Sequence, residues 1–282
     1  MIPAQFDYHA PATVEEALSL LSQAGDDVKV LAGGQSLIPV LRLRMAAPEV
    51  LIDLGKVDGL TGVRDDGDAI VIGAMTSHHT MASDPLVAEH ARLITEAVRT
   101  VADPQVRHRG TFGGALVHAD PAGDLPAVAL ALEAEFTIQG AGGSRTVPAA
   151  DFFVDLFTTA VGEDEILTHV RVPKHTGWGA DYQKFTRVSQ QWSIVGVAAT
   201  VRMDGGTIAE ARVGLTNMGS TPIRAHSVES AVAGATVDGI EAAAASAAEG
   251  TNPPSDLNGD AAYRRHLATV LTARALRAAT GS

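Results

Sequence analysis

Two short glycine-containing segments most constrain what this chain can fold into. Residues 32–36 read Ala-Gly-Gly-Gln-Ser, and residues 111–115 read Thr-Phe-Gly-Gly-Ala. Each segment places two adjacent glycines beside a hydroxyl-bearing residue, Ser36 in the first and Thr111 in the second. The first follows the apolar run Val28–Leu31 and precedes a helix-like run, so it predicts a loop that leads from a strand into a helix.

Such loops suit the binding of an anion by main-chain N–H groups. Glycine has no Cβ, so it reaches positive φ at little steric cost and lets a phosphate approach the backbone closely. A nearby hydroxyl adds a donor, and a helix that begins after the loop adds the positive end of its dipole. Two such loops together can hold the two halves of a pyrophosphate. A plain turn is the alternative for either pair alone, because the chain contains 28 glycines.

Other common site motifs are absent from the sequence. It has no G-x-x-x-x-G-K-[ST] segment, no G-x-G-x-x-G segment opening a helix and no G-x-S-x-G segment. With no cysteine and no assigned nucleophile, no catalytic residue is predicted. The pairs His78-His79 and His118-x-Asp120 lack a third ligand at a suitable spacing, so no metal site is predicted either.

The two segments resemble the paired A-G-G-x-S and T-x-G-G-[NS] motifs of the FAD-binding subunits of molybdenum hydroxylases. These subunits have the vanillyl-alcohol-oxidase-type, or PCMH-type, flavin fold, and the chain most resembles the medium (flavoprotein) subunits of aerobic carbon monoxide dehydrogenases. The likeness extends through Phe6–His9, Asp103–Arg107, Gly214–Asn217 and Ala262–Arg265. Ala115 departs from the family, which usually has Asn or Ser there, so a side-chain contact to the cofactor is lost while main-chain contacts can remain.

The resemblance implies FAD as the cofactor and a set of residues that contact it. The set comprises both glycine segments and five further positions: Ala32, Gly33, Gly34, Gln35, Ser36, Val101, Thr111, Phe112, Gly113, Gly114, Ala115, Asp124, Val161, Lys184 and Trp192.

Each of the five further positions also has an ordinary structural interpretation. Asp124 resembles an aspartate that hydrogen-bonds the cofactor, and it could instead cap the following helix. Lys184 resembles a lysine near the pyrimidine end of the flavin, where a cation stabilises the reduced ring, and it could instead be a solvated strand residue. Trp192 stands where the family has a tyrosine over the isoalloxazine, and it could be a core anchor. Val101 and Val161 match apolar flavin contacts and could be ordinary core valines.

Composition narrows the kinds of partner. The formal net charge of −12 disfavours nucleic acid or an anionic membrane as the main partner. No run approaches the roughly 18 apolar residues that a membrane span requires, and no secretory signal is indicated, so a cytoplasmic protein is expected. Because the chain has no cysteine, any iron–sulfur cluster that exchanges electrons with it must lie on another chain.

Periodicity and turn signals predict an α+β architecture. The resemblance implies that residues 1–176 form a PCMH-type FAD-binding domain, with subdomains of about 1–55 and 56–176. It implies that residues 177–282 form a C-terminal carbon monoxide dehydrogenase flavoprotein-type domain, in which the pattern predicts a three-stranded antiparallel sheet and a helical bundle. Pro173–Gly177 is the expected linker. Thr13 and Glu16 have the spacing of a helix capping box.

The resemblance implies an electron-transfer subunit of a heterotrimeric complex. Its partners would be a large molybdenum-cofactor subunit and a small 2Fe-2S subunit, in a dimer of heterotrimers that can associate with the inner face of the membrane through its partners. The FAD would pass electrons from the 2Fe-2S clusters to an external acceptor such as a quinone. The medium subunit of a related aldehyde, xanthine or N-heterocycle dehydrogenase, an independent flavin oxidoreductase, and a flavin-free scaffold subunit are the alternatives.

Overall fold

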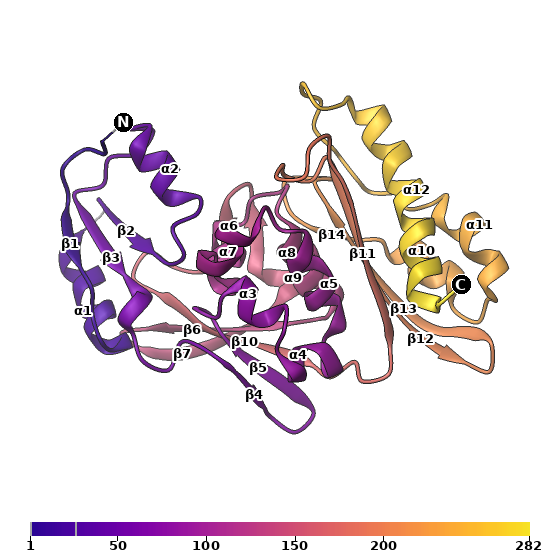
Figure 1. Ribbon diagram of the computed structural model, residues 1–282, viewed down its shortest axis with the longest axis horizontal. Coiled ribbons are helices and arrows are strands. Elements are labelled where there is room, and N and C mark those ends of the chain that lie inside the picture. Colours follow the sequence, from indigo (N-terminus) through magenta and orange to yellow (C-terminus); the bar gives the residue numbers. More distant parts are fainter. Residues whose placement is uncertain (1, 26) are drawn as a thin grey trace.

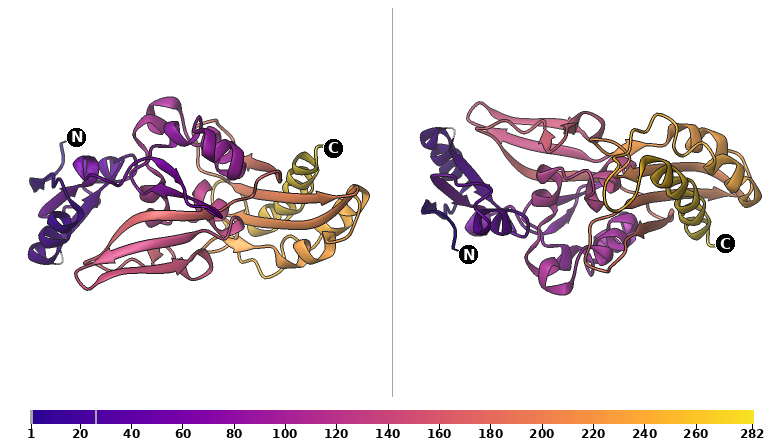
Figure 2. Two further views of the ribbon diagram at one scale, coloured as in Figure 1. Left: turned by 90° about the horizontal axis from the view of Figure 1, so that it is seen from below. Right: turned by 90° about the horizontal axis from the view of Figure 1, so that it is seen from above.

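The computed structural model describes residues 2–25 and 27–282, which form three larger sheets arranged along the length of the molecule and one two-stranded sheet (Figure 1). The N-terminal unit and the C-terminal helices lie at opposite ends in both views of Figure 2. Across the described residues, no helix is both long enough and apolar enough to cross a membrane.

The N-terminal unit is a small parallel sheet with two helices packed against it. Its strands are β1 (Asp7–His9), β2 (Val28–Leu31) and β3 (Val50–Asp53), in the order β1-β3-β2, with helices α1 (Val14–Ala24) and α2 (Leu37–Arg42). The predicted cap of α1 is confirmed, because the Glu16 amide donates to Thr13 Oγ1 at 3.1 Å. The first glycine segment is the loop between β2 and α2, as its flanking pattern predicts.

The central unit is built on a five-stranded antiparallel sheet. Its order is β4-β5-β10-β6-β7, from strands β4 (Val63–Asp65), β5 (Ala69–Gly73), β6 (Glu135–Gly140), β7 (Gly143–Pro148) and β10 (Ile166–Pro173). Strand β7, whose residues are mostly exposed and polar, has no apolar alternation and is missed by the sequence pattern. The short elements η1 (Leu54–Lys56), α9 (Ala149–Phe152), β8 (Phe153–Asp155) and β9 (Thr158–Thr159) complete the unit.

Helices cover this sheet on the side toward the C-terminal half. They are α3 (His78–Met81), α4 (Pro85–His90), α5 (Arg92–Thr100), α6 (Pro104–Arg109), α7 (Phe112–His118) and α8 (Asp124–Ala131). The pattern over 85–101 predicts one helix, but Ala91 has φ −143° and ψ 47° and divides it into α4 and α5. The second glycine segment occupies the start of α7, so its glycines are helical rather than part of a preceding loop.

The C-terminal unit is an antiparallel sheet with helices on one face. The three expected strands are β11 (Gly179–Phe185), β12 (Val195–Asp204) and β13 (Thr207–Thr216), and a fourth, two-residue strand β14 (Ile223–Arg224) is added beside β13. Helices α10 (His226–Val232), α11 (Ile240–Ala244) and α12 (Ala261–Thr280), with the turn η2 (Val237–Gly239), cover the outer face. The fourth strand lies where the sequence predicts the start of a helix at Pro222.

The inner face of this sheet packs on α5 and α8, which therefore lie between two sheets (Figure 1). All eight residues of α8 are buried as a result. The backbones approach closely at Gly214 on β13, where a Cβ would overlap the carbonyl oxygen of Ala127 and lie 3.0 Å from its carbon. The backbone contact between strand and helix thus requires a glycine.

We predict that Gly214→Ala destabilises the chain by about 1–3 kcal/mol, because the added methyl group forces β13 away from α8. Urea unfolding of the full chain measures the change. Gly142→Ala is the matched control, since Gly142 is exposed and a Cβ there meets no atom within 4 Å. Equal unfolding midpoints for the two variants would contradict the packing argument.

Candidate cofactor-binding site

The two glycine segments, about eighty positions apart in the sequence, touch each other in the structure. A Cβ on Gly33 would overlap the carbonyl oxygen of Arg109 and lie 2.8 Å from the Cα of Gly110. A Cβ on Gly114 would lie 3.1 Å from the Cβ of Ala32. The loop of the N-terminal unit and the start of α7 therefore form one continuous surface, and side chains at either glycine would push them apart.

The first loop carries main-chain donors that the protein itself does not use. Within residues 2–25 and 27–282, no backbone acceptor is found for the amides of Gly33, Gly34, Gln35 and Ser36. Gly34 is buried and has φ 75°, a conformation that favours glycine. The Gln35 side chain folds back and donates to the Gly33 carbonyl at 3.1 Å. An anion with several acceptor oxygens fits this donor set.

The second segment differs from the expectation that it too offers free amides. The Phe112 amide donates to Thr76 O at 2.9 Å and the Gly113 amide to Ala74 O at 2.7 Å. The Gly114 amide is capped by Thr111 Oγ1 at 3.2 Å. Gly113 is required instead by packing, because a Cβ there would lie 2.8 Å from the Cα of Ala74. The second segment thus supplies a rigid wall and the dipole of α7, while the first supplies the free donors.

Helix α7 leads from the glycine surface to the predicted aromatic residue. Its seven residues rise about 10 Å and end at His118. The His118 ring lies 5.3 Å from the ring of Phe157 and 6.5 Å from that of Trp192, measured between centroids. Trp192 is 53% exposed, so the interpretation as a core anchor is wrong. Its indole stands at the far end of α7, free to contact a planar ligand.

Asp124 and Lys184 meet each other in a buried network. Lys184 Nζ donates to Asp124 Oδ2 at 2.7 Å and to the Thr100 carbonyl at 3.2 Å. Asp124 Oδ1 accepts from Tyr182 OH at 2.7 Å and from Ser193 Oγ at 2.6 Å. The alternative of a helix cap is wrong for Asp124, because Gly123 is the N-cap residue of α8 and the carboxylate is held by these three side chains. The solvated alternative for Lys184 is wrong too, since its side chain is 8% exposed.

Tyr182 and Ser193 are site residues that the sequence argument missed. Tyr182 precedes Lys184 by two positions on β11, so a strand pattern places both side chains on one face. Burial and the neighbouring Asp124 carboxylate raise the pKa of the Tyr182 phenol well above its ordinary value, so the phenol stays a hydrogen-bond donor. The two-residue spacing of Tyr182 and Lys184 on a strand is thus a sequence signal for Tyr182. Ser193 lies outside any regular element, so no pattern in the sequence indicates it.

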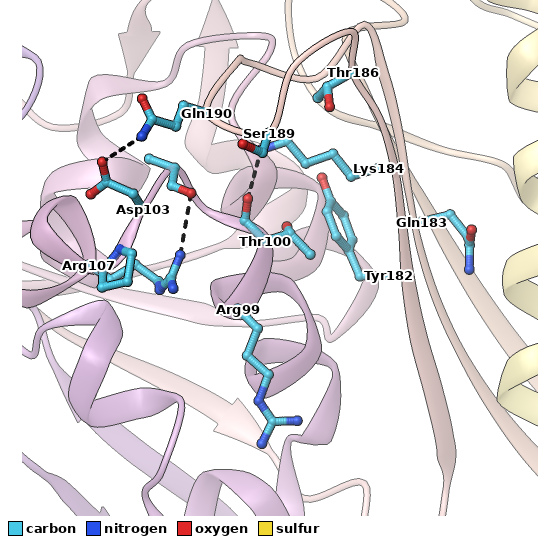
Figure 3. A pocket seen from close by; sticks show the side chains of 12 residues that line it. Arg99, Thr100, Asp103, Arg107, Tyr182, Gln183, Lys184, Thr186, Ser189 and Gln190 are labelled. Carbon is cyan, nitrogen blue, oxygen red and sulfur yellow. Dashed lines mark hydrogen bonds between the residues drawn. The ribbon is translucent and has the colours of Figure 1, made fainter.

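A cavity of about 620 Å³ opens beside this network. Figure 3 shows Lys184 and Tyr182 of β11 on one side and Thr100, Asp103 and Arg107 on the other. Arg107 Nη1 donates to the Val101 carbonyl at 2.8 Å, which ties α6 to the end of α5. Gln190 Nε2 donates to Asp103 at 2.9 Å across the cavity mouth.

The two predicted valines lie in different places. Val101 is the C-cap residue of α5, between two residues that line this cavity, Thr100 and Ala102. Val161 lies half-buried after β9, packed on the central core. Ala115 is half-buried on α7, and its small side chain projects little from the helix surface. Of the predicted residues, the structure thus groups the glycine segments, the Asp124–Lys184 pair and Trp192 around α7 and its flanks, and Val161 lies apart from them on the central core.

The paired histidines of the sequence have structural roles here. His78 is buried beneath the second segment, with its amide donating to Gly110 O at 2.9 Å. Burial, aided by the Arg107 charge, lowers the pKa of His78 to about 4, so its ring is neutral near pH 7. His79 stacks on His108 at 3.8 Å between ring centroids. No group of three or more His, Cys, Asp or Glu side chains in the described part of the chain could hold a metal ion.

The fold and this site define an FAD-binding subunit of the molybdenum hydroxylases, and the chain belongs to that family. Residues 4–175 match the FAD binding domain in molybdopterin dehydrogenase, and residues 180–279 match the CO dehydrogenase flavoprotein C-terminal domain. The predicted family, flavin fold and FAD cofactor are thereby confirmed.

Within this class the chain is similar to carbon monoxide dehydrogenase medium chains. It is 43% identical to that of Hydrogenophaga pseudoflava, over 99% of this chain and 98% of the relative. A solved structure of carbon monoxide dehydrogenase from that organism, lacking the Mo-pyranopterin moiety of the molybdenum cofactor, matches with a TM-score of 0.96 and 44% identity, over 100% and 99% of the two chains. The 6-hydroxypseudooxynicotine dehydrogenase complex subunit alpha of Paenarthrobacter nicotinovorans is 38% identical, over 98% and 95%.

We predict that Lys184→Met destabilises the chain by about 3–5 kcal/mol, because it leaves the Asp124 carboxylate buried without its cation. In the double variant Asp124→Asn with Lys184→Met, the amide oxygen can still accept from Tyr182 and Ser193, so part of the loss should be recovered. Denaturant unfolding of both single variants and the double variant measures the coupling. Strictly additive losses would show that the pair is not a coupled unit.

Proposed function

We propose that this chain holds FAD with its diphosphate on the Ala32–Ser36 loop, its middle along α7 and its ring between Lys184 and Trp192. The observation that carries the proposal is the contact between the two glycine segments, with four unused amides on the first. The negative charge of a diphosphate is favoured there, since the dipole of α7 begins at the same surface. When bound, the flavin supplies reversible one- and two-electron transfer.

The residues of this chain would position and tune that group. The loop amides donate to phosphate oxygens, and Ser36, whose hydroxyl caps no helix amide, can add a further donor. Lys184 would lie near the ring and stabilise negative charge on the reduced flavin, an effect that its ion pair with Asp124 partly offsets. Trp192 would cover one face of the ring and limit access of solvent. Val101 and Val161 would give apolar contacts.

We propose further that the chain relays electrons between partner subunits and an outside acceptor. Electrons would arrive from 2Fe-2S clusters on a small subunit, after substrate oxidation at a molybdenum cofactor on a large subunit, and leave to an acceptor such as a quinone. The absence of cysteine in the sequence supports clusters on another chain. A dimer of heterotrimers in the cytoplasm, associated with the inner face of the membrane through its partners, is the assembly we propose.

The substrate of the complex is proposed to be carbon monoxide, because the medium chain from H. pseudoflava is more similar than the subunit from the 6-hydroxypseudooxynicotine enzyme, at 43% against 38% identity. Because the two identities differ by little, a second candidate function remains, that of the medium subunit of an aldehyde, xanthine or N-heterocycle dehydrogenase. The substrate would in either case bind to the large subunit, so this chain's site would be the same.

We predict that the purified full chain shows the visible absorption of bound flavin, and that Gly33→Val weakens FAD binding at least about tenfold, or about 1.4 kcal/mol. The valine would separate the loop from Arg109 and misalign the four amides. Cofactor released by denaturation is identified as FAD, and Gly142→Val is the control with open space. A colourless chain that never takes up FAD would favour the scaffold alternative, and full flavin occupancy in Gly33→Val would reject the loop site.

We predict that substrate reduces the flavin of this chain only when both partner subunits are present. The flavin absorption of the reconstituted complex should bleach on addition of carbon monoxide and recover on addition of a quinone. The isolated chain, treated in the same way, is the control. Bleaching of the isolated chain by a small organic donor would instead indicate an independent flavin oxidoreductase.

A further inference from the structure

The segment between β11 and β12 carries Trp192. It is anchored on both sides of the indole, by Gln190 to Asp103 and by Ser193 to Asp124, and the Ser193 amide donates to the Ala122 carbonyl. Residues 187–190 are exposed, and Trp192 faces a cavity of about 660 Å³ that is also lined by Phe157 and Pro121. The indole therefore has room to turn, and little side-chain packing fixes it. Its position depends on how firmly the backbone at residues 192–194 is held.

Asn217 holds this backbone from the end of β13. Its side-chain Nδ2 donates to the carbonyls of Ser193 at 2.8 Å and Ile194 at 3.3 Å, while its own amide donates to Pro121 O at 2.8 Å. Asn217 is buried and has φ 61°, a left-handed conformation that asparagine tolerates better than most residues. One residue thus ties the Trp192 segment to the loop that follows α7.

Arg264 holds the same backbone from the first turns of α12. Its side chain is fully buried, with Nη1 donating to the Ile194 carbonyl and Nη2 to Asp256 Oδ1 at 2.7 Å. Burial opposes ionisation of Asp256, but hydrogen bonds from the Asn258 amide and from Arg264 outweigh it, so the Asp256 pKa lies below its ordinary value. Burying a guanidinium without hydrogen-bond partners is unfavourable. The Ile194 carbonyl and the Asp256 carboxylate therefore stabilise the buried position of Arg264.

The geometry points to Arg264 and Asn217 as positioning residues that fix the backbone directly after Trp192, at Ser193 and Ile194, and so set the indole against the ring end of the proposed flavin site. The inference rests on the proposed function for what the indole faces, but the hold on the backbone is independent of it. Neither residue touches the glycine loops, so removing either should loosen the ring end of the site while the diphosphate end keeps FAD. Both belong to sequence segments, Gly214–Asn217 and Ala262–Arg265, that the site itself leaves without a role.

The test follows Trp192 fluorescence in the full chain with Trp178→Phe, which leaves Trp192 as the single tryptophan. In the FAD-free form, Arg264→Met and Asn217→Gly should increase the amplitude of nanosecond depolarisation about twofold, because the backbone hold is lost. Glycine adopts positive φ readily, so Asn217→Gly removes the amide without straining the chain. Arg264→Lys keeps the positive charge and one donor nitrogen, so it should retain most of the rigidity.

Arg265→Met is the matched control, an exposed arginine next to Arg264 on the same helix, and it should leave the depolarisation unchanged. Unchanged depolarisation in folded Arg264→Met and Asn217→Gly would overturn the inference, and if Arg264→Met does not fold, Asn217→Gly alone decides. In the FAD-loaded form, quenching of Trp192 by the flavin should weaken in both variants while FAD occupancy stays the same. If FAD fails to bind or to quench Trp192 in the parent chain, the proposed function fails, and the FAD-free measurement still tests the hold.

Discussion

The buried carboxylate of Asp124 joins the two halves of this molecule. It sits at the start of α8, the helix enclosed between the central and C-terminal sheets, and each of its three side-chain donors comes from residues 182–193. A carboxylate this deep is stable only because a cation and two hydroxyls surround it. The position of β11 against α8 is therefore set by these hydrogen bonds as well as by apolar packing, and the ring end of the proposed cofactor site depends on it.

A second constraint, made of backbone alone, governs the other end of the site. The N-terminal unit approaches the central unit where Gly33 lies against Arg109 and Gly110. No side-chain interaction could bring two main chains as close, and no residue other than glycine leaves room for it. The free amides of the first loop are thus presented at a junction between units rather than inside either one.

The sequence predicted the parts of this molecule that depend on local pattern. The helix cap at Thr13, the strand-to-helix loop at Gly33–Gly34 and the meander of β11 to β13 follow from spacing and turn residues, and the family and cofactor followed from motif resemblance. What it missed depends on contacts between distant residues. The Phe112 and Gly113 amides are taken by carbonyls before α3, and Asp124 is held from β11, which no local pattern shows. Strand β7 has mostly exposed polar residues, and it is a strand because its backbone pairs with β6 at the edge of the central sheet.

The proposed cofactor site is therefore shared among three units, each with its own group of buried apolar residues. In this proposal its diphosphate end depends on the glycine contact, and its ring end depends on Asp124, Asn217 and Arg264. Because these contacts share no residues, the two ends can be disturbed independently. In the proposed site, turning of the Trp192 indole on its fixed backbone would change access to the ring without disturbing the contacts of the diphosphate.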